Sequence, residues 1–131
     1  MANNVSRSAG TLGAARAIVW AYVAVVLGTI VALVVLSRTS PHLATSEAWG
    51  HAVIVAVFAV LLPLRMRAAG RGNAGAVRAV GIIAAVLTVV NIVEACLPAF
   101  PAWMRVEMVV IAAMMLAVVA CVVATVRRRV V

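Results

Sequence analysis

The chain has 131 residues, of which 67% are hydrophobic and only 11% are charged, and its net charge is +8. A soluble domain of this size has too high a ratio of surface to volume to bury so much apolar area, so the solvent for most of this chain is lipid. The basic residues, all Arg, are spread between and beyond the apolar runs instead of lining one face, which argues against a nucleic-acid-binding protein.

Four apolar segments follow one another along the chain, each long enough to cross a hydrocarbon core of about 30 Å as a helix. Helices satisfy their backbone polar groups internally, as lipid requires. The sequence therefore predicts an all-α membrane protein, a single domain over residues 1–131 with transmembrane helices at about 14–36, 47–64, 76–97 and 102–126. The first apolar run is longer than the roughly 7–15 residues of the apolar region of a signal peptide, so we interpret it as a retained span. The alternative is a signal peptide that is cleaved near residues 42–45.

The distribution of Arg predicts the orientation of these helices, because cytoplasmic segments of membrane proteins carry an excess of Lys and Arg. We predict an up-down-up-down four-helix bundle with both termini and the Gly-rich connection at 65–78 in the cytoplasm, and only Arg38 and Arg105 outside. So one-sided a distribution argues against a dual-topology antiparallel dimer. The predicted cytoplasmic residues are Arg7, Arg16, Arg65, Arg67, Arg71, Arg78, Arg127, Arg128 and Arg129.

Small residues recur at steps of three and four along every predicted span. Helices in lipid associate through close van der Waals packing, so such stripes predict where neighbouring helices approach one another. The stripes are Ala17, Ala21, Ala24 and Gly28; Ala48, Ala52, Ala56 and Ala59; Gly81, Ala84, Ala85 and Thr88; and Ala113, Ala117, Ala120 and Ala124.

With this topology, all acidic residues and both His residues fall on the outer half of the bundle. Glu47 and His51 are four residues apart and so share one helix face. Thr88, Asn91 and Glu94 repeat at steps of three and form a polar stripe on the third span. We predict one outer polar site for a cation, a proton or a small polar ligand. Its candidate residues are Glu47, His51, Asn91, Glu94, Arg105 and Glu107.

A metal ion is one ligand to consider for this site, because carboxylate and imidazole groups suit Zn²⁺, Fe²⁺ or Mn²⁺. Glu47 and His51 are weak candidate ligands, since no recognised motif spaces the remaining ones, and metal binding stays unknown. The structural interpretation is that Glu47 follows the N-cap residue Ser46 in the first turn of a helix, and that His51 either hydrogen-bonds Glu47 or faces interfacial water.

Glu94 is the strongest single functional candidate, because an ionisable group inside a membrane segment is costly. We expect its carboxylate to point into the bundle, with Arg105, across the turn that holds Pro98 and Pro101, as its charged partner. A structural pair with Arg105 is the interpretation we favour slightly over a functional carboxylate. Glu107 is expected to pair with Arg105 or to contact interfacial water.

The remaining residues are assigned to the membrane environment. Arg127, Arg128 and Arg129 are predicted to contact anionic lipid headgroups. Trp20 and Tyr22 are predicted to belong to an interfacial aromatic belt. Cys96 and Cys121 fall in different spans without a CxxC motif, so we predict that they never form a disulfide bond.

The sequence holds no GxSxG, HExxH, P-loop or dinucleotide-binding motif, so we predict a protein that is not an enzyme and needs no cofactor. The leading hypothesis is a small polytopic protein of the bacterial plasma (inner) membrane, an accessory, sensor or immunity-type subunit that acts through lipid, a membrane-protein partner or its own homo-oligomer. The alternative is a small oligomeric transporter or channel using Glu47, His51, Asn91 and Glu94. Polar residues crowd the outer half, which favours the first hypothesis.

Overall fold

A computed structural model describes residues 2–130 of the chain and, within them, all side chains except those of residues 2–6 and 8. Every regular element it describes is helical. The elements are α1 (Ala2–Thr39), the short 3₁₀ helix η1 (Pro41–Leu43), α2 (Ser46–Gly70), α3 (Ala74–Ala95) and α4 (Ala102–Val130). Within these residues, four helical segments are long and apolar enough to cross a membrane, namely Ala9–Thr39, Ser46–Gly70, Ala74–Ala95 and Ala102–Val130. They are the helices of a small polytopic membrane protein.

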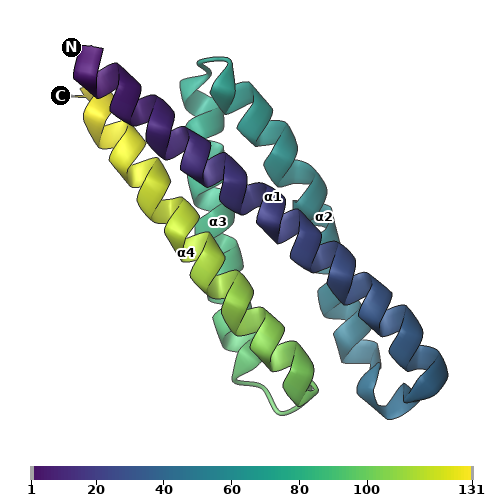
Figure 1. The fold of residues 1–131 in the computed structure, drawn as a ribbon. Coiled ribbons are helices and arrows are strands. Elements are labelled where there is room, and N and C mark those ends of the chain that lie inside the picture. Colours follow the sequence, from purple (N-terminus) through teal and green to yellow (C-terminus); the bar gives the residue numbers. More distant parts are fainter. Residues whose placement is uncertain (1, 131) are drawn as a thin grey trace.

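The long helices lie side by side in one bundle (Figure 1). Neighbouring helices pack as α1 with α2, α2 with α3, α3 with α4, and α4 with α1. Both ends of the chain lie at one end of this bundle together with the connection between α2 and α3. We name it the basic end, because it carries Arg16, Arg71 and Arg78, and we name the opposite end, with Glu47, Glu94 and Glu107, the acidic end.

The first turn of α2 is set by Thr45. Its side-chain oxygen accepts a hydrogen bond of 3.2 Å from the backbone N–H of Ala48, which satisfies one of the free donors of a helix start. The prediction that Ser46 caps this helix is wrong, because the Ser46 hydroxyl donates instead to the carboxylate of Glu47, at 3.2 Å. The cap fixes where α2 begins and so places His51 in its second turn.

The connection between α2 and α3 is a tight turn of three residues. Gly72 has a φ of 92°, a left-handed conformation that favours Gly. Asn73 then caps α3, since its side-chain oxygen accepts from the backbone N–H of Ala76 at 3.1 Å. The connection predicted over residues 65–78 is therefore mostly helix, and Arg65, Arg67 and Arg78 lie on α2 and α3.

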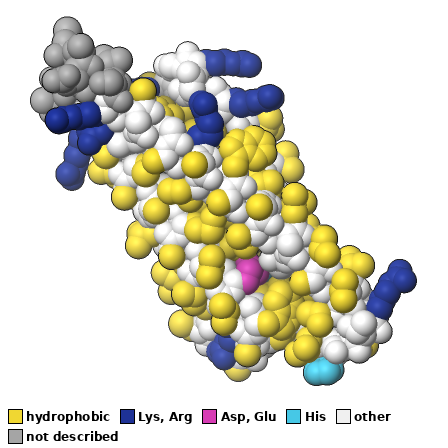
Figure 2. All heavy atoms as spheres, viewed as in Figure 1, with side chains coloured by type: hydrophobic (Ala, Val, Ile, Leu, Met, Phe, Trp, Pro, Cys, Tyr) yellow, Lys and Arg dark blue, Asp and Glu magenta, His cyan; other side chains and the backbone are white. Residues whose placement is uncertain are grey.

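The surface of the bundle is apolar along its middle. Large side chains such as Val31, Val60, Ile82 and Leu116 are 59–64% exposed, and Figure 2 shows apolar side chains over most of one face between the two ends. An exposed apolar belt of this extent suits contact with lipid acyl chains, in agreement with the predicted membrane location.

The small-residue stripes give a mixed outcome. Ala48 and Ala52 of α2 and Ala84 of α3 are buried, as expected for close helix approach. The prediction is wrong for the other two helices. Most residues of these two stripes are exposed, because α1 and α4 turn larger side chains such as Val19 and Met115 into the core. The exposed stripe residues are Ala17, Ala21, Ala24, Gly28, Ala113, Ala117 and Ala120.

Candidate functional site

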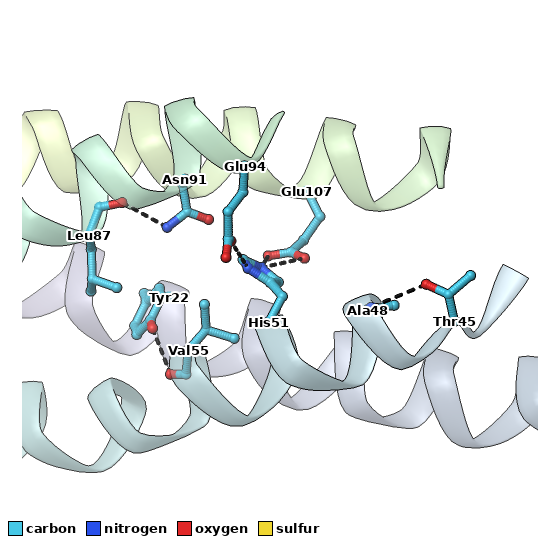
Figure 3. A network of polar contacts seen from close by, with 9 residues as sticks. All are labelled: Tyr22, Thr45, Ala48, His51, Val55, Leu87, Asn91, Glu94 and Glu107. Carbon is cyan, nitrogen blue, oxygen red and sulfur yellow. Dashed lines mark hydrogen bonds and ion pairs between the residues drawn. The ribbon is translucent and has the colours of Figure 1, made fainter. Parts of the chain in front are cut away.

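A buried imidazole lies between two carboxylates at the acidic end of the bundle (Figure 3). His51 is 1% exposed. Its Nδ1 is hydrogen-bonded to a carboxylate oxygen of Glu94. On the other side of the ring, Nε2 lies 3.4 Å from Oε2 and 3.5 Å from Oε1 of Glu107. We name these three residues the His–Glu–Glu cluster.

Three different helices position this cluster. His51 comes from α2, Glu94 from the last turn of α3, and Glu107 from the second turn of α4. The short connection after Ala95 reverses the chain, so the two carboxylates return to the same depth. The ring of Phe100, in that connection, meets the imidazole edge to face with ring centroids 6.1 Å apart.

Two buried oxygen atoms, one in the His–Glu–Glu cluster and one beside it, have no hydrogen-bond partner among the described residues. Oε2 of Glu107 is buried and makes no hydrogen bond within the described residues, although it lies within ion-pair distance of His51. Asn91, one turn deeper than Glu94 on α3, donates from Nδ2 to the backbone carbonyl of Leu87 at 2.7 Å. Its Oδ1 is buried without a partner. Unsatisfied buried acceptors are costly and are suited to receive a proton or a water molecule.

Tyr22 lies beside the cluster on its deeper side (Figure 3). Its hydroxyl donates to the backbone carbonyl of Val55, at 2.6 Å, and ties α1 to α2 one turn below His51. Tyr22 is 0% exposed, so its predicted place in an interfacial belt is wrong, whereas Trp20 is 55% exposed. Helical periodicity separates these two residues, which are only two positions apart and face nearly opposite directions.

The structure separates Glu47 from the other candidates. Its side chain is exposed and contacts Ser46, and the expected hydrogen bond between His51 and Glu47 does not form, because the imidazole uses both nitrogens toward α3 and α4. Within the described residues, no group of three His, Cys, Asp or Glu side chains is arranged to hold a metal ion. The pairing of Glu47 with His51 as metal ligands thus loses its geometric basis.

Arg105 does not fill the role expected of it. Its Nε donates to the backbone carbonyl of Ala95 at 3.0 Å, which satisfies an acceptor at the end of α3. Across residues 2–130, no ion pair joins Arg105 to Glu94 or Glu107. The expectation that Arg105 is the charged partner of Glu94 is wrong, and His51 takes that place.

The terminal Arg residues lie at the basic end. Arg127 and Arg129 are exposed, and Arg128 is partly buried because it donates from Nη1 to the backbone carbonyl of Arg7, at 2.9 Å. Arg128 thereby ties the end of α4 to α1. Cys96, exposed, and Cys121, partly buried, are both free thiols, as predicted.

The sequence contained a signal for the cluster that the spacing of Glu47 and His51 obscured. His51 adjoins Ala52 and lies three residues after Ala48, and both Ala residues belong to the predicted packing stripe of that helix. A residue on that stripe faces the neighbouring helices, not the residue one turn away on its own helix. The polar stripe of α3 was found correctly, since Thr88 and Asn91 are buried and Glu94 points at α2.

Comparison with known proteins gives no match, because no protein family, no curated protein and no solved structure is significantly similar to this chain. The function of the protein is therefore inferred from the geometry and charge of the bundle.

The chemistry of the cluster centres on one proton. A protonated imidazole donates from both ring nitrogens and can satisfy Glu94 and Glu107 together, with charge-assisted hydrogen bonds. A neutral imidazole donates from one nitrogen only, so a lone pair on the other then faces a carboxylate. Gain or loss of this proton changes the attraction between α2 and the pair formed by α3 and α4.

Proposed function

We propose that this protein is a non-enzymatic accessory or sensor subunit of the bacterial plasma membrane, in which the His–Glu–Glu cluster responds to protons from the outer side. The proposal includes an up-down-up-down topology with both termini in the cytoplasm. The asymmetry of Arg supports this orientation, because the basic end holds the chain ends and the α2–α3 connection. The acidic end then faces outward, with His51 about one and a half turns inside α2.

One observation carries the proposal, namely the burial of His51 between carboxylates of two other helices. Histidine is the side chain whose charge ordinarily changes near neutral pH. The groups around it are Glu94 and Asn91 from α3, Glu107 from α4, Phe100 from the connection and Tyr22 from α1. Glu47 and Arg105 make contacts elsewhere. The balance of charge at this point is thus set by one imidazole and two carboxylates.

His51 belongs to α2, and α2 has the smallest packed interfaces of the four long helices. α2 packs less extensively against α1 and α3 than α4 packs against those same helices. A change in the charge of His51 therefore acts on the helix with the least other packing to restrain it. Local elements with few packed contacts are the ones that move in regulated proteins. We infer that a shift of α2 relative to α3 and α4 is the response presented to a partner.

The transporter alternative has less support because the polar groups do not continue through the bundle. Below the cluster, Thr88 and Asn91 donate to carbonyls of their own helix. The core beyond them is apolar and includes Leu62, Val80 and Val118. A path for ions needs polar groups at all depths. Flux of protons or cations through liposomes that contain the purified protein would instead support transport.

A distance measurement tests the response. Spin labels at Val57 on α2 and Leu116 on α4, both exposed, would be attached in a background with Cys96 and Cys121 replaced by Ser. We expect the distance distribution in nanodiscs to change between about pH 5 and pH 8, the range in which histidine ordinarily titrates. The His51→Gln variant should lose this change, whereas the matched His42→Gln variant, at an exposed residue, should keep it. A distribution that is independent of pH in the parent protein contradicts the proposal.

The accessory role is tested by purification in mild detergent at both pH values, with mass spectrometry of the proteins that co-purify. We expect a membrane protein to co-purify in stoichiometric amount with the parent protein at one pH only. It should co-purify with the His51→Gln variant in equal amounts at both pH values. A pure homo-oligomer with no partner at either pH counts against an accessory subunit.

A further inference from the structure

A second polar site lies at the basic end, between α1 and the end of α2. It is a pocket with a volume of about 390 Å³, within the roughly 300–1,000 Å³ range of small-molecule sites. Three Arg residues line it, namely Arg16 of α1, Arg67 of α2 and Arg71, which directly follows α2. Figure 2 shows most of the basic side chains visible on one face at this end of the molecule.

Within the residues that the structure describes, the three positive charges of this pocket have no counter-charge. All three acidic side chains of the sequence are at the acidic end. In the described part of the chain, the guanidinium groups of Arg16, Arg67 and Arg71 have neither a hydrogen-bond partner nor an ion-pair partner. Like charges held close together repel one another, so the arrangement is favourable when an anion lies between them.

The end of α2 does not use these guanidinium groups for capping. The backbone N–H of Arg71 binds the carbonyls of Arg67 and Ala68, and the N–H of Gly72 binds the carbonyl of Ala69. Because the backbone itself satisfies these acceptors, the side chains remain available to a ligand.

Gly70 leaves room for the guanidinium of Arg16 beside α2. A Cβ atom at this position would lie 2.5 Å from Nη2 of Arg16, well inside van der Waals contact. The missing side chain lets the guanidinium of α1 lie directly against α2. Arg16 is thereby brought to the same pocket as Arg67, in the last turn of α2, and Arg71, the residue that follows this helix.

The surroundings of the pocket indicate its depth in the membrane. Trp20, four residues after Arg16 and 55% exposed, forms part of the wall together with Pro63. Trp side chains concentrate at the level of lipid headgroups, where one edge contacts apolar chains and the other contacts water. A cationic pocket at this level, open beside an apolar wall, fits a phosphate ester that carries acyl chains.

We propose that Arg16, Arg67 and Arg71 form a binding site for the headgroup phosphate of an anionic phospholipid, with its acyl chains along Trp20 and Pro63. Arg side chains suit this ligand because the planar guanidinium donates two parallel hydrogen bonds to phosphate oxygens. The site is separate from the His–Glu–Glu cluster and does not depend on the sensor role. It is also distinct from the exposed Arg residues at the end of α4.

Native mass spectrometry of the full-length protein in mild detergent tests this site, with titration of phosphatidylglycerol and, separately, of zwitterionic phosphatidylcholine. We expect preferential binding of phosphatidylglycerol to the parent protein. Arg16→Gln should weaken that binding about five-fold, the typical contribution of one basic residue at an anionic membrane surface. The matched control is Arg78→Gln, which removes an exposed Arg at the same end but outside the pocket and should leave the affinity unchanged.

A charge-preserving variant separates a built site from diffuse attraction. Gly70→Leu keeps the net charge but places a side chain where Arg16 now lies, so it should weaken phosphatidylglycerol binding as Arg16→Gln does. Thermal unfolding of each variant establishes that it is folded. If Arg78→Gln weakened phosphatidylglycerol binding as much as Arg16→Gln, or if Gly70→Leu did not weaken it, the proposal would be overturned in favour of diffuse attraction. Inorganic phosphate that binds as tightly as the lipid would overturn the phospholipid assignment.

Discussion

Nε2 of His51 lies 3.4 Å from a carboxylate oxygen of Glu107, and this contact crosses the bundle from α2 to α4. The two residues are 56 positions apart, and their helices are diagonal to one another, since α2 packs against α1 and α3 while α4 packs against the same two helices. A polar contact across a diagonal is set by the depth and rotation of both helices together. It therefore links the packing of the whole acidic end to the state of one imidazole.

The His51→Ala variant should destabilise the bundle by about 3–5 kcal/mol, the usual cost of removing one member of a buried ion pair. Two carboxylates would then face each other in the core without a donor. Chemical or thermal unfolding in detergent measures this loss. The matched variant His42→Ala, at an exposed residue of η1, should change the unfolding free energy by no more than about 0.5 kcal/mol. Equal stability of the two variants would contradict the buried cluster.

Glu94→Gln should destabilise the protein more than Glu47→Gln does. Glu94 contacts the buried imidazole, whereas Glu47 is exposed and contacts only Ser46. We expect a loss of a few kcal/mol for Glu94→Gln and, in combination with His51→Ala, a coupling energy on the order of 1–3 kcal/mol in a double-mutant cycle. Purely additive effects would mean that the two side chains do not act together. A Glu94→Gln protein of full stability that captures no partner would instead assign Glu94 a direct role in recognition.

The sequence predicted the broad architecture more successfully than the polar contacts, for a physical reason. Lipid imposes long apolar helices, and that demand is visible in every apolar run from residue 17 onward. Which polar groups meet depends instead on the rotation of each helix about its own axis. Arg105 is near Glu94 along the chain, but its guanidinium turns to the carbonyl of Ala95, and His51 reaches Glu94 from another helix. Rotation is fixed by the whole set of packed side chains, which no single spacing encodes.

Gly81→Ala should be less stable than Gly28→Ala by about 1–3 kcal/mol, the usual cost of overpacking. A Cβ atom at Gly81 would lie 2.8 Å from Cγ1 of Val122 on α4, whereas nothing lies within 4 Å of one at Gly28. Val122 cannot yield easily, because a β-branched side chain in a helix has one strongly preferred rotamer. Unfolding of both variants in the same detergent measures the difference. Adding the second substitution Val122→Ala should remove most of this difference in stability. A difference that persists would mean that α3 and α4 do not make their close contact at Gly81 and Val122.

The native thiols test the orientation of the bundle. Cys96 is exposed at the end of α3, at the acidic end, and Cys121 is partly buried on α4 toward the basic end. If the acidic end faces outward, a membrane-impermeant maleimide should label Cys96 in intact cells and leave Cys121 unlabelled. The two thiols are also too far apart in depth for the Cα separation of under about 7 Å that a disulfide requires, so mild oxidation should give no intramolecular crosslink.

The opposite end needs its own reporter, and Ala74→Cys in a background without the native thiols provides it. Ala74 is exposed in the first turn of α3, beside the connection from α2 at the basic end. We expect this thiol to react with the impermeant maleimide only after the membrane is permeabilised, because Arg-rich ends of membrane helices favour the cytoplasmic side. Labelling of Ala74→Cys in intact cells, with Cys96 protected, would invert the bundle. The His–Glu–Glu cluster would then respond to cytoplasmic protons, and the pocket of Arg16, Arg67 and Arg71 would face the outer leaflet.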